Sequence, residues 1–193
     1  MTIRESVAVQ SGTHLVPNEI EDGRSGAITV EGEGLVVDFG GAVLQGSPQE
    51  VEPDQRRGTA VFVRGKSITI RNLHVRGFKF GLVARDAENL RLVDCTFEDN
   101  YRPRLRSGLE RESFADWMSF HRNENDEWLR FGAAAYLVNC DRAEVRGMRA
   151  RNGQCGLMMT RCDDGLVWNS DLSFLSAVGL GMYRSSNNRV RHN

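Results

Sequence analysis

The chain has 193 residues, 40% of them hydrophobic, and a formal net charge of −1. This composition supplies enough apolar residues for a core, and the near-neutral charge argues against a nucleic-acid partner. The first residues lack the apolar region of a signal peptide, and no run of about 18 apolar residues could span a membrane, so we expect no membrane partner.

The first recognisable element covers residues 34–46, "GLVVDFGGAVLQG", where short apolar stretches are bounded by glycines. Such stretches are typical of short strands separated by tight turns. Residues 46–58, "GSPQEVEPDQRRG", are polar and carry two of the four prolines, which predicts a loop insertion.

The rest of the chain repeats itself every 22–23 residues. Residues 67–75 ("SITIRNLHV") align with 89–97 ("NLRLVDCTF"), and 156–162 ("GLMMTRC") with 179–185 ("GLGMYRS"). No helical pattern recurs within the repeats, and each has room for three short strands. We therefore predict an all-β fold, a right-handed single-stranded parallel β-helix of about five rungs in a single domain.

The register of the repeats predicts columns of stacked residues. Cys140 and Cys162 are neighbours inside the coil, either as reduced core thiols or as a disulfide. One column holds residue types that tolerate left-handed backbone geometry, which predicts a corner: Asn72, Asp94, Gly147, Asn169 and His192. Two further columns are predicted to point inward: Ala60, Leu82, Ala135, Leu157 and Leu180; and Phe62, Ala84, Leu137, Met159 and Met182.

Residues 101–132 interrupt the repeat, and we expect them to form a helical lid. The sequence from Ser107 to Glu110 has the form of a capping box, and an apolar stripe follows: Leu109, Phe114, Trp117, Met118 and Phe120. One outward column is apolar enough to need a cover: Val61, Val83, Tyr136, Met158 and Gly181. The predicted anchors of that cover are Trp117, Trp128 and Phe131. The lid edge then either forms a substrate groove or only covers an apolar patch.

Arg161 and Arg184 are predicted to lie one rung apart, next to this face. At about 4.8 Å two such charges repel by about 0.9 kcal/mol in water. Either an acid such as Asp163 or Asp164 offsets the repulsion, or the pair binds an anionic ligand such as a uronic acid polymer. The insert also offers His121 and Glu124, which could transfer protons or hold a cation such as Ca²⁺, or could belong to a solvated loop.

The repeats in "GLVVDFGGAVLQG", "SITIRNLHVRGF" and "GLGMYRSSNNRVRHN" resemble those of parallel β-helix proteins with the pectin-lyase-like fold. The resemblance covers roughly residues 28–193 apart from the two inserts. It implies a secreted or periplasmic protein that acts on or binds polysaccharide. Paired aspartates of the kind that glycosidases of this fold use occur at Asp163 and Asp164, but without the other motifs of those enzymes.

Under this resemblance, the catalytic candidates are Arg161 and Arg184 for the substrate carboxylate and His121 with Glu124 for proton transfer, as in a polysaccharide lyase. The substrate-binding candidates are Tyr136, Tyr183, Arg85 and Asp116. The alternative is a non-catalytic polysaccharide-binding or structural β-helix, in which the tyrosines stack on sugar rings. Because the chain stops just after a strand begins, we expect further C-terminal rungs in the natural protein, and a monomer if the chain is full length.

Overall fold

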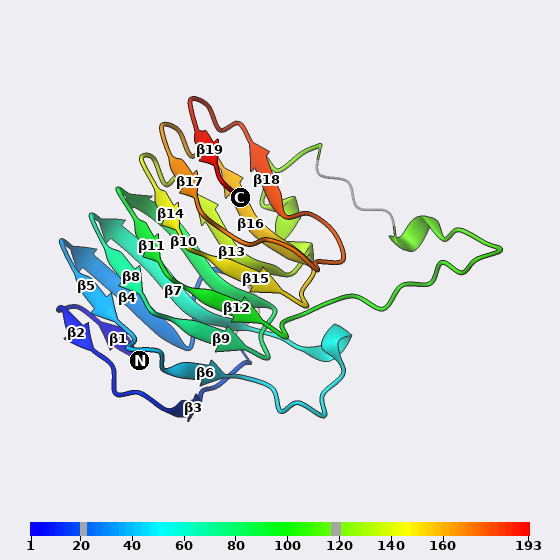
Figure 1. Cartoon of the computed structure of the whole chain (residues 1–193), viewed down its shortest axis with the longest axis horizontal. Coiled ribbons are helices and arrows are strands. Elements are labelled where there is room, and N and C mark those ends of the chain that lie inside the picture. The colour runs from blue at the N-terminus through cyan, green and yellow to red at the C-terminus, as the bar shows by residue number, and fades with distance from the viewer. Residues whose placement is uncertain (20–22, 117–120) are drawn as a thin grey trace.

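The computed structural model describes residues 1–19, 23–116 and 121–193. In this part the chain coils through three parallel sheets, and each turn adds one strand to a sheet (Figure 1). The first sheet contains seven strands: β1 (Thr2–Ile3), β4 (Ile28–Glu33), β7 (Thr59–Lys66), β10 (Phe80–Glu88), β13 (Ala133–Val138), β16 (Cys155–Thr160) and β18 (Leu180–Tyr183).

The second sheet supplies a strand to every described turn, and the third sheet supplies a strand to the first five turns. The second sheet contains β2 (Val7–Ala8), β5 (Val36–Asp38), β8 (Thr69–Arg71), β11 (Arg91–Val93), β14 (Glu144–Arg146), β17 (Leu166–Trp168) and β19 (Arg189–Arg191). The third contains β3 (Thr13–Leu15), β6 (Val43–Gln45), β9 (His74–Arg76), β12 (Thr96–Glu98) and β15 (Arg149–Arg151). The fold is therefore all-β, a β-helix-like solenoid, as the repeats predict.

The described coil has more turns than the five expected from the sequence. The first two turns do not share the short repeat, because Thr2 pairs with Thr29 and Thr29 pairs with Phe62. Strands β2 and β3 are also largely exposed, so their sequences show no clear alternation of apolar and polar residues. A period of 22–23 residues therefore misses these turns.

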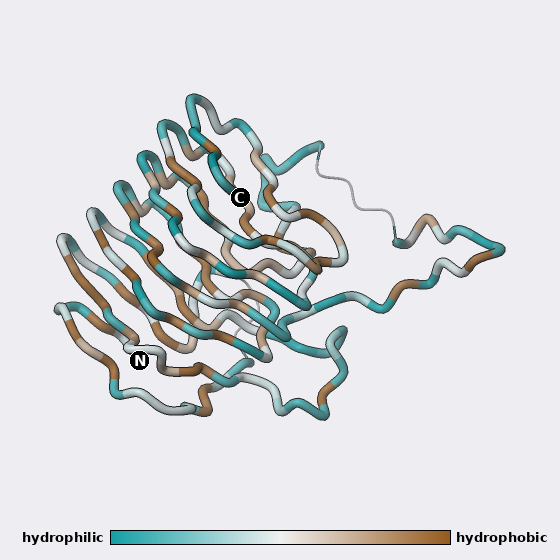
Figure 2. Tube along the Cα trace, viewed as in Figure 1, coloured by the Kyte–Doolittle hydropathy of each residue, from teal (hydrophilic) through white to brown (hydrophobic). Residues whose placement is uncertain are grey.

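The core fills the inside of the coil. Leu82, Ala135, Leu157 and Leu180 lie side by side on successive strands of the first sheet, as predicted. Hydrophobic residues recur along each turn of the chain (Figure 2). Stacking like residues on neighbouring turns buries each inward side chain against the turns above and below.

The predicted columns are wrong by one residue in β7. Leu82 pairs with Val61 and Val83 with Phe62, and the register shifts again between Ala84 and Ala87. Phe62 thus packs with Val83 outside the coil, while Val61 lies in the core. A one-residue slip moves every side chain of a strand to the opposite face, so this detail depends on the actual pairing.

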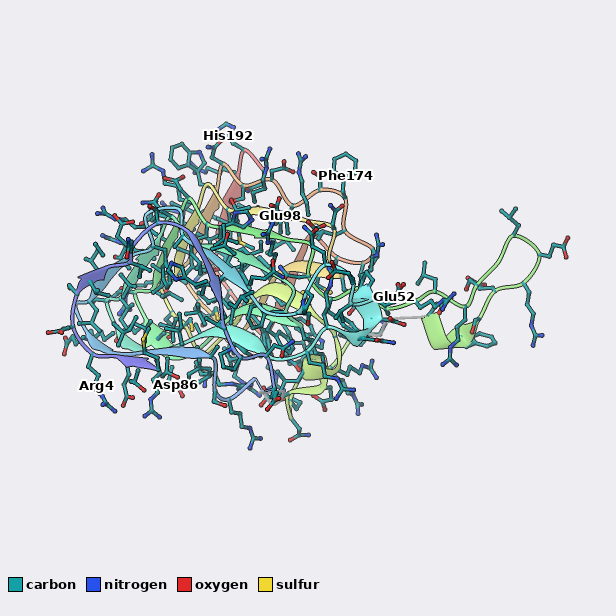
Figure 3. All side chains as sticks on the ribbon, turned by 90° about the horizontal axis from the view of Figure 1, so that it is seen from below. Arg4, Glu52, Asp86, Glu98, Phe174 and His192 are labelled. Carbon is teal, nitrogen blue, oxygen red and sulfur yellow. The ribbon has the colours of Figure 1, made fainter. Side chains whose placement is uncertain are left out.

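The predicted corner column is confirmed. Asn72, Asp94, Asn169 and His192 have φ angles of 52–55°, and Gly147 has φ 63°. Asparagine, aspartate and glycine adopt this left-handed conformation at low cost, which lets each turn change direction at the same place. Seen from below, Arg4 and Asp86 lie on one side of the coil, and Phe174 and His192 lie on the opposite side (Figure 3).

The two insertions differ from each other in outcome. Residues 46–58 form a loop with one 3-10 turn, η1 (Pro53–Gln55). The helical lid expected at 101–132 is wrong: its described residues contain only two 3-10 turns, η2 (Phe114–Asp116) and η3 (Glu127–Arg130). The stripe residues Trp117, Met118 and Phe120 lie outside the described part of the chain.

Lack of packing explains why no helix forms before η2. Leu109 is fully exposed and Phe114 is 82% exposed, so the two described residues of the apolar stripe cover no surface. A short amphipathic helix depends on such packing for its stability. Ser107 does not cap a helix either, because its Oγ accepts a hydrogen bond from the Ser113 N–H. This segment instead extends away from the sheets (Figure 1).

All four cysteines are buried free thiols, Cys140 and Cys162 included. The Cys140 N–H points at the Cys162 Sγ, 3.3 Å away, and the Cys162 N–H donates to the Ser185 Oγ at 3.1 Å. The small inward residues therefore satisfy backbone groups of the turn before.

No helix in the described part of the chain has the length and apolar character needed to cross a membrane.

Candidate functional site

Residues 121–131, here called the docked segment, lie against the outward face of the first sheet. Trp128, 2% exposed, and Phe131 pack there in a second apolar cluster, separate from the core of the coil. The cluster contains Phe62, Phe80, Val83, Trp128, Phe131, Ala133, Tyr136, Val138, Cys155 and Met158. The prediction that the insert covers this face through Trp128 and Phe131 is confirmed; the third predicted anchor, Trp117, lies outside the described residues.

Asn123 fixes the docked segment by hydrogen bonds. Its side-chain amide is fully buried and donates to the hydroxyls of Tyr136 and Thr160, on two neighbouring strands. Its Oδ1 accepts the N–H of Trp128 at 2.8 Å. Because a buried amide is costly to leave unpaired, these bonds define where the segment sits on the sheet.

The neighbouring residue, Glu124, forms the centre of a charged cluster. Its Oε1 accepts a hydrogen bond from the Tyr183 hydroxyl at 2.6 Å and forms an ion pair with Arg184 Nη2, also at 2.6 Å. Its Oε2 lies 3.2 Å from Arg161 Nη2, which also donates to the Glu124 main-chain oxygen at 3.1 Å. We call Glu124, Arg161, Tyr183 and Arg184 the Glu124 cluster.

The electrostatics of this cluster follow from its contacts. The hydrogen bond from Tyr183 and the charges of Arg184 and Arg161 hold the pKa of Glu124 below its usual value of 4.5. An acid offsets the repulsion between the two arginines, as one of the two sequence interpretations requires. That acid is Glu124 of the insert rather than Asp163 or Asp164, and Asp163 instead accepts the Ser186 N–H.

The backbone of the two arginines is also unusual. Arg161 and Arg184 have φ angles of 51° and 48°, in a column that they share with Asp86 and Asn139. Asparagine and aspartate adopt this conformation readily, whereas arginine does so at a cost. Both arginines therefore lie at a corner of the coil, immediately after strands β16 and β18.

Arg85 and Tyr136 contact the docked segment and are not free to bind a ligand in this conformation. Arg85 donates to Gly23 O and to Asp126 Oδ1, each at 3.1 Å, and its guanidinium lies over the Tyr136 ring. Tyr136 is 1% exposed, and burial raises the pKa of its phenol. A sugar ring can stack on Tyr136 only if the docked segment leaves, whereas Tyr183 is half-buried at the edge.

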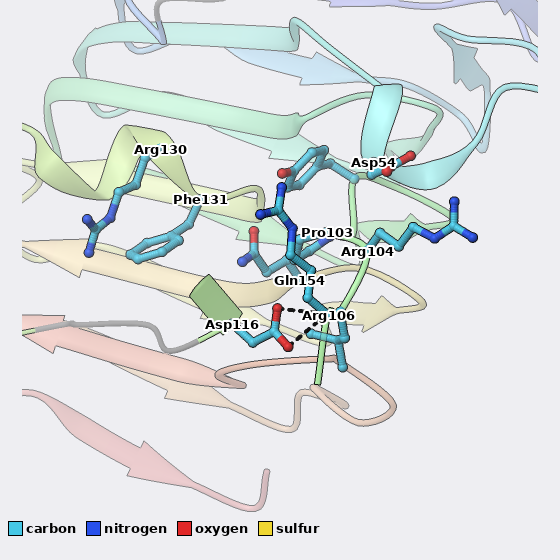
Figure 4. Close-up of a pocket in the computed structure, with 10 residues that line it drawn as sticks. Asp54, Pro103, Arg104, Arg106, Asp116, Arg130, Phe131 and Gln154 are labelled. Carbon is cyan, nitrogen blue, oxygen red and sulfur yellow. Dashed lines mark hydrogen bonds between the residues drawn. The ribbon is translucent and has the colours of Figure 1, made fainter. Parts of the chain in front are cut away.

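The remaining sequence candidates are not gathered into the Glu124 cluster. His121 is exposed on the docked segment. Asp116 accepts the N–H groups of Arg106 and Ser107 and lines a cavity of about 650 Å³ (Figure 4). This cavity lies at the start of β16, beside Gln154, whereas Arg161 follows the end of that strand. The structure thus unites Glu124 with Arg161, Tyr183 and Arg184, and places Asp116 near the opposite end of β16.

The Ca²⁺ expectation has no preformed ligand set in the described part of the chain. There, no three side chains of histidine, cysteine, aspartate or glutamate come together as metal ligands would. The carboxylate of Glu124 is surrounded by cationic donors instead of other acids. The residues of this cluster fit an anion and not a cation.

Sequence reasoning missed Asn123, which organises the site, and gave Asp126 only as a carboxylate that could act in proton transfer or hold a cation, whereas it pairs with Arg85. Asn123 occurs in the polar run "RNENDE" at 122–127, which has no counterpart in the repeat. A polar run of this kind usually indicates a solvated loop. Only the apolar Trp128 immediately after it signals that the run is held against the protein.

Comparison with known proteins supports the fold. No protein-family model matches the chain, and no curated protein sequence matches it. Among solved structures, the chain is similar to a protein from Parabacteroides merdae described as a "putative glycosyl hydrolase". The TM-score is 0.56 at 10% sequence identity, and the match covers 97% of this chain and 79% of that chain. At this identity the likeness shows a shared β-solenoid architecture.

Proposed function

We propose that this protein is a carbohydrate-active β-helix protein that binds an acidic polysaccharide at the ends of β16 and β18. Arg161, Arg184 and the Tyr183 hydroxyl would receive the carboxylate of a uronate unit. One observation carries the proposal: these three donors, from two adjacent turns, converge on a single carboxylate, that of Glu124. Preorganised cationic donors of this kind are the usual means of binding a carboxylate.

The surroundings of the cluster suit a sugar polymer. The Tyr183 ring is half-buried and forms a T-shaped contact with Trp128 at a centroid distance of 5.9 Å. Such a ring has an apolar face for a sugar and a hydroxyl that can bond to it. The pectin-lyase-like class and the glycosyl-hydrolase description of the structural neighbour support carbohydrate as the ligand class. A secreted or periplasmic location is part of the proposal, since such polymers occur outside the cytoplasm.

Lyase chemistry is the second candidate, favoured by the two arginines. Neutralising the uronate carboxylate makes the C5 proton more acidic. A base then removes that proton, the C4–O bond breaks, a C4=C5 double bond forms, and the departing oxygen takes up a proton. Exposed His121 is the base in this scheme. Glu124 is a poor base, because three donors already hold its charge.

The carboxylate site is tested by binding. We expect oligogalacturonate to bind the wild-type protein and Arg184→Ala to bind at least about tenfold more weakly, since a charged hydrogen bond contributes roughly 1.5–3 kcal/mol. Isothermal titration calorimetry measures both. Arg189→Ala, at an exposed position of the second sheet, is the matched control.

A methyl-esterified oligogalacturonate separates carboxylate recognition from general sugar binding, and it should not bind. Equal binding of the acid and the ester would exclude a carboxylate site. Absorbance of an unsaturated product on longer incubation, lost in His121→Ala, would establish the lyase. Binding without product from any uronate would leave the binding module as the function.

A further inference from the structure

The carboxylate site described above is filled by the protein itself. We propose that Glu124 is an internal occupant of the site, and that the carboxylate of an acidic saccharide binds by replacing it. This inference rests on the proposed function and adds to it how the site is regulated. It concerns the side chain of one residue and requires no opening of the docked segment.

Glu124 makes the contacts that a ligand carboxylate would make. Its Oε1 accepts the hydrogen bond of the Tyr183 hydroxyl and pairs with Arg184, and its Oε2 accepts a hydrogen bond from Arg161. A uronate carboxylate has the same two oxygens, the same charge and the same planar shape. Two carboxylates cannot share these donors, because they would repel each other and the donors are too few.

The position of the arginines indicates that the site is built for an anion. The preceding members of their corner column are Asp86 and Asn139, which suit its left-handed backbone, and Asn139 Nδ2 donates to Asp86 Oδ1 at 2.9 Å. Arginine replaces these favoured types at two successive turns, where the charges also repel. The left-handed backbone disfavours arginine, so the contacts of the two guanidinium groups explain why arginine occurs at these positions.

The backbone around Glu124 is held independently of its carboxylate. Asn123, fully buried, bonds to Tyr136 and Thr160, and Trp128 is packed in the second apolar cluster. Arg161 additionally bonds to the Glu124 main-chain oxygen. The Glu124 side chain itself is 35% exposed, so it can turn into solvent while the segment stays in place. Exchange is therefore a rotamer change, which is fast compared with domain or lid motion.

An internal occupant lowers the measured affinity of the site. Binding is weakened by the fraction of molecules in which the site is free, so removing the occupant should strengthen binding by the inverse of that fraction. If Glu124 fills the site in about nine molecules of ten, its removal strengthens binding about tenfold. Acid pH is an unsuitable test, because a uronate carboxylate loses its charge in the same range.

The experiment compares oligogalacturonate binding to wild-type protein, Glu124→Gln and Glu127→Gln by isothermal titration calorimetry. Glu127 lies on the same segment, but its Oε2 accepts the Asn125 N–H. Both substitutions remove one negative charge from the segment, so a general charge effect would appear in both. Glu124→Ala is the second variant, and thermal unfolding confirms that each protein is folded.

We expect Glu124→Gln and Glu124→Ala to bind at least about tenfold tighter than wild type and Glu127→Gln to bind like wild type. In the double variant Glu124→Gln/Arg184→Ala the gain should disappear. Equal affinity of wild type and Glu124→Gln would overturn the internal occupant and leave the carboxylate site standing. A gain that persists without Arg184 would also overturn it. Failure of every variant to bind any uronate would overturn the proposed function itself.

Discussion

Single residues at one corner of the coil carry the chemistry of the candidate site. Arg161 and Arg184 adopt a left-handed backbone, which costs roughly 1–2 kcal/mol for a residue with a side chain. Glu124 offsets their mutual repulsion through direct contacts. At this scale the cluster resembles a bound complex in which the ligand carboxylate belongs to the protein.

The lowered pKa of Glu124 predicts a pH-dependent contribution to stability. Since its folded-state pKa lies below the usual 4.5, the charged form stabilises the folded state above that value. This stabilisation is lost as pH falls through the lowered pKa. In urea titrations from pH 7 to pH 3, the free energy of unfolding of wild type should exceed that of Glu124→Gln at neutral pH.

The difference between the two proteins should shrink toward zero at the acid end. Glu50→Gln, at an exposed position in the 46–58 loop, serves as the control for losing one carboxylate. A difference that stays constant over the whole range would show that the carboxylate of Glu124 is not stabilised by the arginines.

Among the elements, the docked segment is the one that the repeat does not define. It contains one short 3-10 turn and depends on Trp128 and Asn123 for its position. Its apolar cluster is separate from the core of the coil. We infer that the segment can detach while the sheets remain folded, since solenoid turns rely on their neighbours for stability.

Trp128→Ala tests this separation. Deleting a buried tryptophan side chain typically costs about 3–5 kcal/mol, and here most of that loss should fall on the docked segment. We expect faster proteolysis between residues 121 and 131, with the far-ultraviolet circular dichroism of the sheets retained. Limited proteolysis followed by mass spectrometry locates the cleavage.

Trp168→Ala is the matched control. Trp168 lies in β17 on the outside of the second sheet, where Arg146 covers its ring at 4.7 Å. Its removal should leave the docked segment protected. If Trp128→Ala keeps the segment protected, or unfolds the whole coil in one step, the segment is not a separate unit.

At the scale of the whole molecule, the four cysteines lie in two packed regions. Cys95, Cys140 and Cys162 belong to the core of the coil, and Cys155 belongs to the second apolar cluster beneath the docked segment. Burial raises the pKa of the Cys95 and Cys155 thiols to about 12, and Cys140 and Cys162 are also buried. Because the thiolate is the reactive form, we expect iodoacetamide at pH 8 to leave all four cysteines unmodified in the native protein. Mass spectrometry should then show four modifications after unfolding in urea. Rapid labelling of any native thiol would contradict the closed packing described here.

The repeat determined much of this architecture. The stacked strands, the corner column from Asn72 to His192 and the adjacency of Arg161 and Arg184 follow from residues that recur at a constant interval. Each turn repeats the same local pattern, and like residues stack because parallel turns lie in register. Such information is local, and it can be taken from the sequence alone.

Only the tertiary structure decided the rest. The slip of Phe62 to the outer face depends on how β7 pairs with β10. No helix forms before η2 because Leu109 and Phe114 find no surface to pack against. Glu124 meets the arginines because two neighbours hold the docked segment in place. Trp128 buries its ring in the second apolar cluster, and the Asn123 amide donates to the hydroxyl of Thr160, 37 residues later in the chain. An insertion has no repeat to define its place, so packing and hydrogen bonding across the fold determine it.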